Sequence, residues 1–384
     1  MTVTGLEGIT DFREFSLERK EASHTVCTFT AGKKTYDLSD RFFRSKLKIF
    51  DQDCQLVMTG LPSQVRYTKG YSENQIQVSM ISQSAQLEEQ KATRIFQNAD
   101  QTYRDVLRQV AKADGFEVIF TEEGIGTQAL GRAVVQLNET TMDFIRRAAM
   151  DMDTFVWVDD KSDGIYQIRL GRHRDGAPVL IEEDSLLVQE RELTQEKEWL
   201  RFRIHADDPA AQRLDIGKRA DIAGREYIVC ALAIEKSRQE YRYTYTAVRS
   251  QKKQNDAKKN TETKTLHRFL GKVVSNQDEE RRGRVQVDFS SGEVTDLGQK
   301  KIWIDVATIY DGEQGGVIFL PDEGDFVDVL WDGTSFLVTG TRRMQSIASE
   351  HWNPEEKCMV DKLGSKLCFA KGTIAISGRT VEIN

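Results

Sequence analysis

The sequence predicts a mainly β fold with an α+β portion, and three observations support this fold class. Short runs of alternating apolar and polar residues occupy both ends of the chain, and a period of two is typical of half-buried strands. Residues 96–170 change to the spacing of amphipathic helices. Glycines then mark a series of tight turns in the last third of the chain.

Composition narrows the class of protein. A chain of 384 residues has room for two to four domains, and 39% hydrophobic with 30% charged residues indicates a globular protein. The net charge of -7 argues against a general nucleic-acid binder, which normally carries a basic surplus. The N-terminus lacks the basic flank and apolar run of a secretory signal, so we expect synthesis in the cytoplasm without a signal peptide.

The cysteines are five in number and scattered, without close pairs: Cys27, Cys54, Cys230, Cys358 and Cys368. An odd number without a paired framework favours buried or free thiols in a reducing cytoplasm.

Residues 1–250 form the first part of the chain. Alternating strands predict β-barrels at about 1–95 and 170–250, with two helix-strand units between them at about 96–170. In the first unit, apolar residues recur at helical spacing and Gly115 ends the helix. In the second, residues 143–146 align with residues 105–108, which indicates a weak internal repeat used as scaffold.

A cluster of aspartates follows the second unit. Asp159, Asp160 and Asp163 could bind calcium, but their spacing does not give the alternating ligands of a calcium loop. Aspartate is also a preferred turn residue, and we expect a plain hairpin turn here.

Residues 251–265 are rich in lysine and lack large apolar side chains. Such a run could contact phosphate, but it is typical of a solvated linker.

Residues 266–345 contain a series of short strands separated by glycines: FLGKVVSNQ, GRVQVDFSS, KIWIDVATI, GGVIFLPD, DFVDVLWD and FLVTGTR. Their number and total length match a small Greek-key barrel such as the OB-fold. In the stretch from Gly315 to Trp331 we expect a strand, a tight turn at residues 321–325 and a second strand.

Residues 346–384 consist of very short alternating pieces. A lone hairpin of such strands is only marginally stable in water. Four apolar residues therefore need another surface, and three identical chains wrapped about one axis would supply it: Ile374, Ile376, Val381 and Ile383.

At this point the sequence resembles a known family, the VgrG and phage tail-spike proteins. Residues 266–345 carry the pattern of their OB-fold, with a GRVxV core, a tryptophan opening the third strand and a GDxVxV run. The matching residues are Gly283, Val285, Trp303, Gly316, Phe319, Pro321, Gly324, Asp325, Val327 and Val329. The β–(α/β)–β order upstream is similar to the phage hub and late-control protein D fold.

The resemblance implies a homotrimer at the front of a phage tail, a tailocin or a type VI-like secretion system. The hub would dock on the inner tube protein beside baseplate proteins, the OB-fold would form a collar, and a β-helical or β-prism tail would pierce the target envelope when the sheath contracts. The chain lacks the His-X-His ending that holds iron in some relatives, so a PAAR-type tip protein or effector cargo is a plausible further partner.

Enzymatic alternatives rest on few residues. Asp322, Glu323, Asp325 and Asp328 supply carboxylates for a wall-degrading glycosidase, but they lie in and beside one strand connection. The five histidines are far apart and lie outside nucleophile and zinc motifs: His24, His173, His205, His267 and His351. We expect a structural protein with no catalytic residues.

Two binding alternatives remain open. His351, Cys358 and Cys368 could hold a metal, although zinc ligands normally number four at shorter spacing. An OB-fold can also bind an oligosaccharide or nucleic acid, and the basic residues Arg281, Arg282 and Arg284 sit beside acidic ones in a strand connection. We expect no metal, no cofactor and no nucleic-acid partner.

Overall fold

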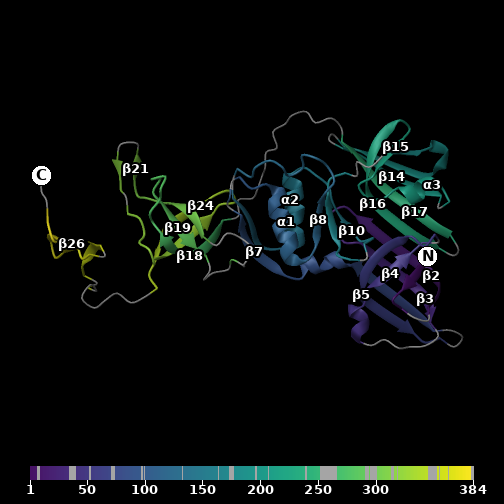
Figure 1. Cartoon of the computed structure of the whole chain (residues 1–384), viewed down its shortest axis with the longest axis horizontal. Helices are drawn as coiled ribbons and strands as arrows, with labels where there is room; N and C mark the ends of the chain where they lie inside the picture. Colours follow the sequence, from purple (N-terminus) through teal and green to yellow (C-terminus); the bar gives the residue numbers. More distant parts are fainter. Residues whose placement is uncertain are drawn as a thin grey trace.

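The computed structural model describes residues 1–6, 9–33, 40–51, 53–70, 74–96, 98, 100–131, 133–162, 164–172, 177–194, 197–205, 207–237, 240–250, 266–289, 294, 301–312, 315–317, 319–344, 353, 355–361 and 363–381. The predicted linker at 251–265 lies outside them. The molecule is elongated, with a large β part at one end, then an α/β part, a small barrel and the C-terminal strands at the other end (Figure 1).

The large β part is one sheet of twelve strands. Its first half contains β1 (Thr2–Thr4), β2 (Ile9–Lys20), β3 (Val26–Lys33), β4 (Leu47–Phe50), β5 (Leu56–Thr68) and β6 (Gln75–Ser82). Its second half contains β12 (Val179–Ile181), β13 (Leu186–Leu193), β14 (Lys197–His205), β15 (Arg219–Ile222), β16 (Arg225–Ser237) and β17 (Glu240–Ser250).

The two halves are joined by antiparallel pairing of β2 with β16, in which Leu17 lies opposite Ile234. The main strand order is β1-β4-β5-β6-β3-β2-β16-β17-β14-β13. The two barrels predicted from the sequence are therefore two halves of a continuous sheet, because strands far apart in the chain pair across the middle. The halves also share one apolar core.

The α/β part confirms the helix-strand units. It contains β7 (Lys91–Phe96), α1 (Tyr103–Asp114), β8 (Glu117–Phe120), β9 (Val134–Thr140), α2 (Thr141–Asp151), β10 (Val156–Asp159) and β11 (Gln167–Leu170). Both helices begin at a threonine whose hydroxyl accepts the N–H of the aspartate three residues on, at Thr102 and Thr140. The aligned residues Asp105 and Asp143 are thus equivalent N-terminal capping positions. Gly115 ends α1 with a left-handed φ of 76°.

Four short helices complete the part of the chain before the barrel: η1 (Asp40–Arg44), η2 (Gln83–Glu88), η3 (Glu183–Ser185) and α3 (Pro209–Arg213).

A buried ionic cluster joins the α/β part to both halves of the large sheet. Arg19 on β2 is 4% exposed, and its guanidinium lies 2.8 Å from Asp160 Oδ1 and 3.1 Å from Asp215 Oδ1. The same group donates to the Val57 carbonyl at 2.7 Å. Burial opposes the charge of Asp215, but Arg19 and Lys161 outweigh burial and hold the pKa of its carboxyl well below its usual range.

The aspartates considered as calcium ligands take part in ion pairs instead. Asp160 pairs with Arg19, and Asp159 Oδ2 lies 2.6 Å from Arg169. Asp159 also accepts the Lys161 N–H at 3.1 Å, as a turn residue does. Asp163 lies outside the described residues.

The small barrel is closed by β18 (His267–Ser275), β19 (Arg284–Asp288), β20 (Lys301–Val306), β24 (Phe336–Arg342) and β23 (Phe326–Trp331). Apolar residues from every one of these strands fill its centre. Ile95 of β7 and Val135 of β9 belong to the same buried cluster, so the β7–β9 ribbon anchors the barrel to the α/β part.

One predicted strand of the barrel is wrong. Among the described residues of the stretch GGVIFLPD, only β22 (Gly315–Gly316) is strand, and it pairs with β21 (Asp311–Gly312). Phe319 is 68% exposed rather than buried. The apolar residues of this stretch suggested a core strand, but the described ones belong to an irregular connection between β22 and β23.

The C-terminal part is a three-stranded antiparallel sheet of β25 (Lys357–Val360), β26 (Lys366–Ala370) and β27 (Thr373–Ser377). Within residues 355–361 and 363–381, only Cys368 is buried. The fold as a whole confirms the mainly β prediction, and no described residue of the last sheet belongs to the three apolar cores.

Candidate assembly surfaces

The residues of the OB-fold motif build the barrel itself. Val285, Val327 and Val329 are fully buried in its core. Gly283 and Gly324 have φ values of 74° and 97°, which other residues rarely adopt. These five residues therefore serve the fold of the barrel.

The other motif residues lie at the margin of the barrel. Trp303 on β20 is half-buried beside the Arg284 guanidinium, 5.9 Å from its ring centre, and Pro321 is buried. Gly316 and Phe319 are exposed on the irregular connection.

The acidic corner at residues 321–325 is a tight turn fastened to β18. The Gly324 N–H donates to the Val273 carbonyl at 2.9 Å, and the Val273 N–H donates to the Asp325 carbonyl at 2.8 Å. Asp325 Oδ2 accepts the Asp322 N–H at 3.0 Å. The Asp325 carboxylate is therefore a structural acceptor, as the turn interpretation expects.

Asp328, the last of the candidate carboxylates, is held by two arginines. It accepts hydrogen bonds from Arg268, and Arg342 lies 2.9 Å from its Oδ1. The hydrogen bond from Arg268 outweighs desolvation and lowers the pKa of this carboxyl. A general acid needs a raised pKa, so Asp328 is poorly suited to acid catalysis.

The basic connection before β19 is tied to carboxylates. The Arg284 guanidinium lies 2.7 Å from Asp278 Oδ1 and 3.0 Å from Glu280. Asp278 also accepts the backbone N–H groups of Glu280 and Arg282. This arrangement orders the connection and offsets the positive charge of Arg284 that a nucleic acid would need.

A hollow of about 360 Å³ lies on the face of β13, β14 and β17. It is lined by Glu190, Arg191, Glu192, Trp199, Arg201 and Thr246. Glu190 lies 3.7 Å from Arg201 across neighbouring strands, so its carboxylate faces a cation. β13 is an outer strand of the sheet and most of its residues are exposed.

The strongest candidate surface is one face of the C-terminal sheet. Ile374 and Ile376 are 66% and 63% exposed. Ile374 lies opposite Phe369, and Ile376 lies opposite Leu367, which in turn faces Met359. Residues directly opposite in a sheet share a face. Apolar side chains on all three strands thus form one uncovered face, which we call the apolar tail face: Met359, Leu367, Phe369, Ile374 and Ile376.

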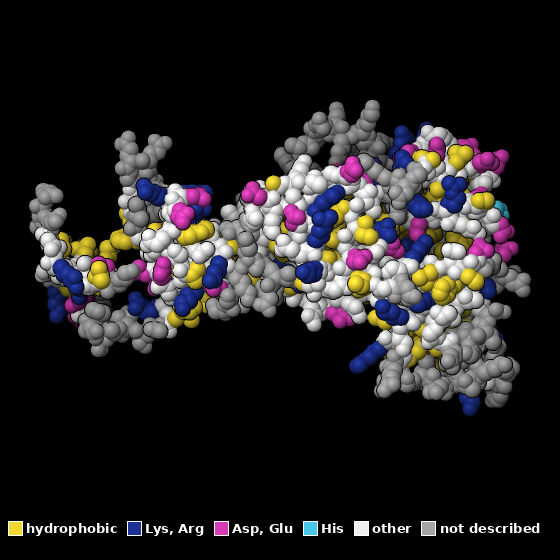
Figure 2. All heavy atoms as spheres, viewed as in Figure 1, with side chains coloured by type: hydrophobic (Ala, Val, Ile, Leu, Met, Phe, Trp, Pro, Cys, Tyr) yellow, Lys and Arg dark blue, Asp and Glu magenta, His cyan; other side chains and the backbone are white. Residues whose placement is uncertain are grey.

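Sequence reasoning found only part of this face. Ile374 and Ile376, which the sequence predicts to pack in a trimer, are exposed in the single chain, and Val381, 47% exposed, lies beyond β27. Ile383 lies outside the described residues. Leu367 and Phe369 were missed, although their spacing of two in KLCFA is the same signal that marked TIAIS. Hydrophobic side chains gather on this end of the molecule in Figure 2.

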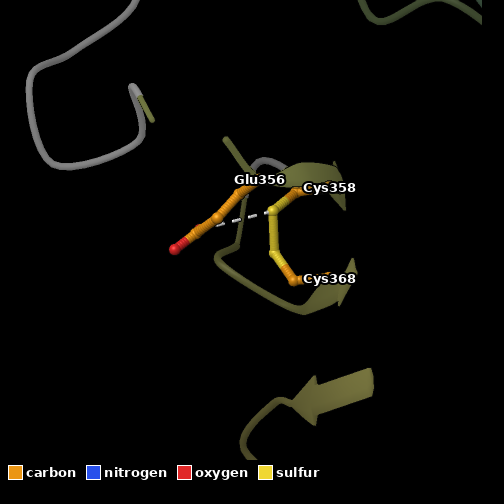
Figure 3. A group of neighbouring side chains, drawn as sticks. All are labelled: Glu356, Cys358 and Cys368. Carbon is orange, nitrogen blue, oxygen red and sulfur yellow. Dashed lines mark hydrogen bonds between the residues drawn. A yellow bond between two sulfur atoms is a disulfide. The ribbon is translucent and has the colours of Figure 1, made fainter. Parts of the chain in front are cut away.

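The cysteine prediction is wrong for one pair. Cys358 and Cys368 form a disulfide, whereas Cys27, Cys54 and Cys230 are free. The pairing of β25 with β26 places the two cysteines directly opposite each other, although ten positions separate them in the chain. Glu356 lies beside them (Figure 3). His351, the third residue of the metal alternative, lies outside the described residues.

Comparison with known proteins identifies the fold first. Residues 269–336 match the family of type VI secretion system/phage-baseplate injector OB domains, and residues 46–212 match the phage tail baseplate hub (GPD) family. Together these matches include more than half of the chain. The search of curated proteins found no match to this sequence.

Solved structures agree with both matches. The E. coli c3393 protein, a type VI secretion component with structural similarity to the T4 phage tail proteins gp27 and gp5, has a TM-score of 0.66 at 12% identity and covers 89% of this chain and 99% of its own. A chain of the lidded Francisella PdpA–VgrG complex has a TM-score of 0.58 at 7% identity over 94% of this chain and 72% of its own.

A third similar structure is the 43 kDa tail protein of prophage MuSo2 from Shewanella oneidensis. It has a TM-score of 0.50 at 11% identity and covers 62% of this chain and 95% of its own. At such identities the likeness shows a shared fold. The chain belongs to the VgrG and phage-tail hub-and-spike family.

Within the described residues, we find no helix with the length and apolar character needed to cross a membrane.

Proposed function

We propose that this chain is a structural, homotrimeric hub and cell-puncturing spike at the tip of a contractile injection machine. Residues 1–250 act as the hub that docks on the inner tube, 251–265 as a linker, 266–345 as the collar and 346–384 as the spike tail. The machine is a phage tail, a tailocin or a type VI-like secretion system. The chain is made in the bacterial cytoplasm and leaves the cell as part of the particle.

The apolar tail face carries this proposal. Four of its five side chains are exposed in a single chain and Leu367 is half-buried, and the sheet that holds them has only Cys368 buried among its described residues. Burial of a large aliphatic side chain is worth roughly 1.5–3 kcal/mol, so covering several of them on each chain gives a substantial driving force. Two further copies of the same chain supply matching faces around one axis.

The proposed role is mechanical and needs no chemistry from the protein. Contraction of the sheath supplies the work, and the chain transmits it. Asp325 and Asp328 serve the turn and an ion-pair cluster, which supports a structural role over wall degradation. The collar and spike make only transient contact with the target envelope. A PAAR-type tip protein or effector cargo binds at the far end of the tail.

Native mass measured by light scattering tests the assembly. We expect the full chain to be a trimer at micromolar concentration, and a chain ending before Glu350 to lose most of its trimer while keeping the barrel folded. A monomeric full chain, or a truncated chain with unchanged trimer content and thermal stability, would contradict the proposal.

Cell-wall turbidity tests the non-enzymatic role. The purified protein should leave peptidoglycan intact. Clearing that a single substitution at Asp322, Glu323, Asp325 or Asp328 abolishes would replace the structural role with an enzymatic one.

A further inference from the structure

The C-terminal sheet contains a pair of cysteines on the face opposite the apolar tail face. Cys358 lies opposite Cys368, and Cys368 lies opposite Ala375. Because successive side chains alternate between faces, this row points away from Ile374 and Ile376. Cys358 is exposed and Cys368 is buried. The pair therefore stays accessible at Cys358 when the apolar tail face is covered.

Cys27 and Cys230 are poorly placed for redox chemistry. Cys27 is fully buried, and burial raises the pKa of its thiol far above the usual range. Burial also raises the pKa of the Cys230 thiol to about 12. Thiolate is the reactive form, so neither reacts readily. Cys54 is exposed and free.

We propose that Cys358 and Cys368 form a redox-gated staple of the spike tail, which is a dithiol in a reducing compartment and closes to the disulfide by exchange with a low-molecular-weight disulfide. The chemistry belongs to the single chain. Its timing, at the passage out of the cytoplasm, rests on the function proposed above.

Closure proceeds in two exchange steps. The exposed Cys358 thiolate attacks the small disulfide, so that a bond forms to Cys358 Sγ and one small thiolate leaves. The Cys368 thiolate then attacks Cys358 Sγ and releases the second small thiolate. Two protein thiols are oxidised, one small disulfide is reduced to two thiols, and the two protons lost by the cysteines pass to the leaving groups through water.

Glu356 is the general base of the first step. Its Oε2 lies 3.8 Å from Cys358 Sγ (Figure 3). The Lys366 ammonium lies 3.5 Å from the same oxygen. In the dithiol state this carboxylate accepts the Cys358 proton and generates the attacking thiolate.

The staple matters because the sheet lacks a core. A cross-link stabilises mainly by restricting the unfolded segment, and short isolated strands are marginal without one.

A competing interpretation is a metal site, since one donor atom each from Glu356, Cys358 and Cys368 lies within 4.8 Å of the others. These are three donors, whereas a structural zinc site has four, and the disulfide uses both sulfurs.

The test uses the full chain with Cys54→Ser, purified with reductant and then treated with oxidised glutathione. We expect the thiol count after denaturation to fall from four to two and the mass to drop by two hydrogens without a glutathione adduct. Peptide mapping should join Cys358 to Cys368. Amide exchange in β25–β27 should slow on the order of 100-fold relative to the reduced protein, while the barrel strands stay unchanged.

Three variants sharpen the result. Cys358→Ser should retain its thiols and its fast exchange. Glu356→Gln should slow closure near neutral pH and recover at higher pH, a profile that a purely structural role would not produce. The matched change Glu355→Gln, at an exposed carboxylate 3.9 Å from Lys371, should leave the rate unchanged.

Three results would overturn the staple. The first is stable glutathione adducts on either cysteine, and the second is equal amide exchange in the oxidised and reduced protein. The third is stoichiometric binding of Zn²⁺ to the reduced protein that blocks oxidation and is lost in Cys358→Ser, which would assign a metal site instead. The thiol count, the mass and the peptide map do not depend on trimer formation, so failure of the trimer and failure of the staple can be told apart.

Discussion

The small barrel and the C-terminal sheet are both short all-β units, but they bury their apolar residues in opposite ways. The barrel closes on itself, and its central valines are fully buried. The C-terminal sheet has two free edges and presents its isoleucines to solvent. The difference indicates that the barrel has a core within one chain, whereas among its described residues the C-terminal sheet buries only Cys368.

The hub, like the barrel, buries its apolar residues within one chain. A substitution in its buried ion cluster should cause the largest loss of folding stability. We expect Arg19→Met to lower the free energy of unfolding by about 3–5 kcal/mol, because it leaves Asp160 buried without its cation and removes one of the two cations that pair with Asp215. Chemical denaturation measures the loss. The neighbouring Lys20→Met, at an exposed residue, is the control and should change stability by less than about 0.5 kcal/mol. Equal losses in both variants would show that the cluster does not hold the hub together.

The second-largest loss of stability should follow a substitution at Gly271, where the backbone of the barrel packs closely against Val287. A Cβ at Gly271 would lie 2.2 Å from Val287 Cγ1, so Gly271→Ala should cost about 1–3 kcal/mol. Gly340→Ala in the same barrel is the matched control, since nothing lies within 4 Å of its Cβ position. Thermal melting of the chain truncated before Glu350 isolates the effect. A barrel unaffected by Gly271→Ala would contradict the tight core described above.

The smallest effect is a pH dependence in the hub. Burial raises the pKa of Glu21 to about 7 from its ordinary 4.5, against the pull of Lys197. A raised pKa means that the folded state favours the protonated carboxyl, so its contribution is complete below pH 4.5 and is lost as the pH rises to about 7.

Glu21→Gln should therefore raise the melting temperature at pH 8 by roughly 1–3 °C and leave it unchanged at pH 4. Glu18→Gln, at an exposed residue paired with Lys20, should alter neither value. A Glu21→Gln variant that follows the parent at every pH would exclude this titration.

The sequence predicted local structure well because local signals determined it. The apolar spacing and Gly115 defined α1, and the GRVxV and GDxVxV runs defined strands of the barrel. The core strand predicted around Phe319 was wrong, because hydrophobicity alone cannot tell a core strand from an exposed connection.

Long-range pairing was harder to predict. Arg19, Asp160 and Asp215 are far apart in the chain, and only the pairing of β2 with β16 and the position of β10 bring them together. The disulfide likewise depends on the register of β25 against β26, which spacing alone does not reveal. Cross-strand register is therefore the physical information that the sequence did not supply.

The most direct test of the contrast between barrel and tail is the native mass of two matched double variants on β27. Ile374→Asp with Ile376→Asp places charges on the apolar tail face, and Thr373→Asp with Ser377→Asp places the same charges on the opposite face of the same strand. Light scattering should find the isoleucine variant largely monomeric with an unchanged barrel melting transition, and the control variant trimeric. Two trimers would contradict the assembly of this chain through its apolar tail face.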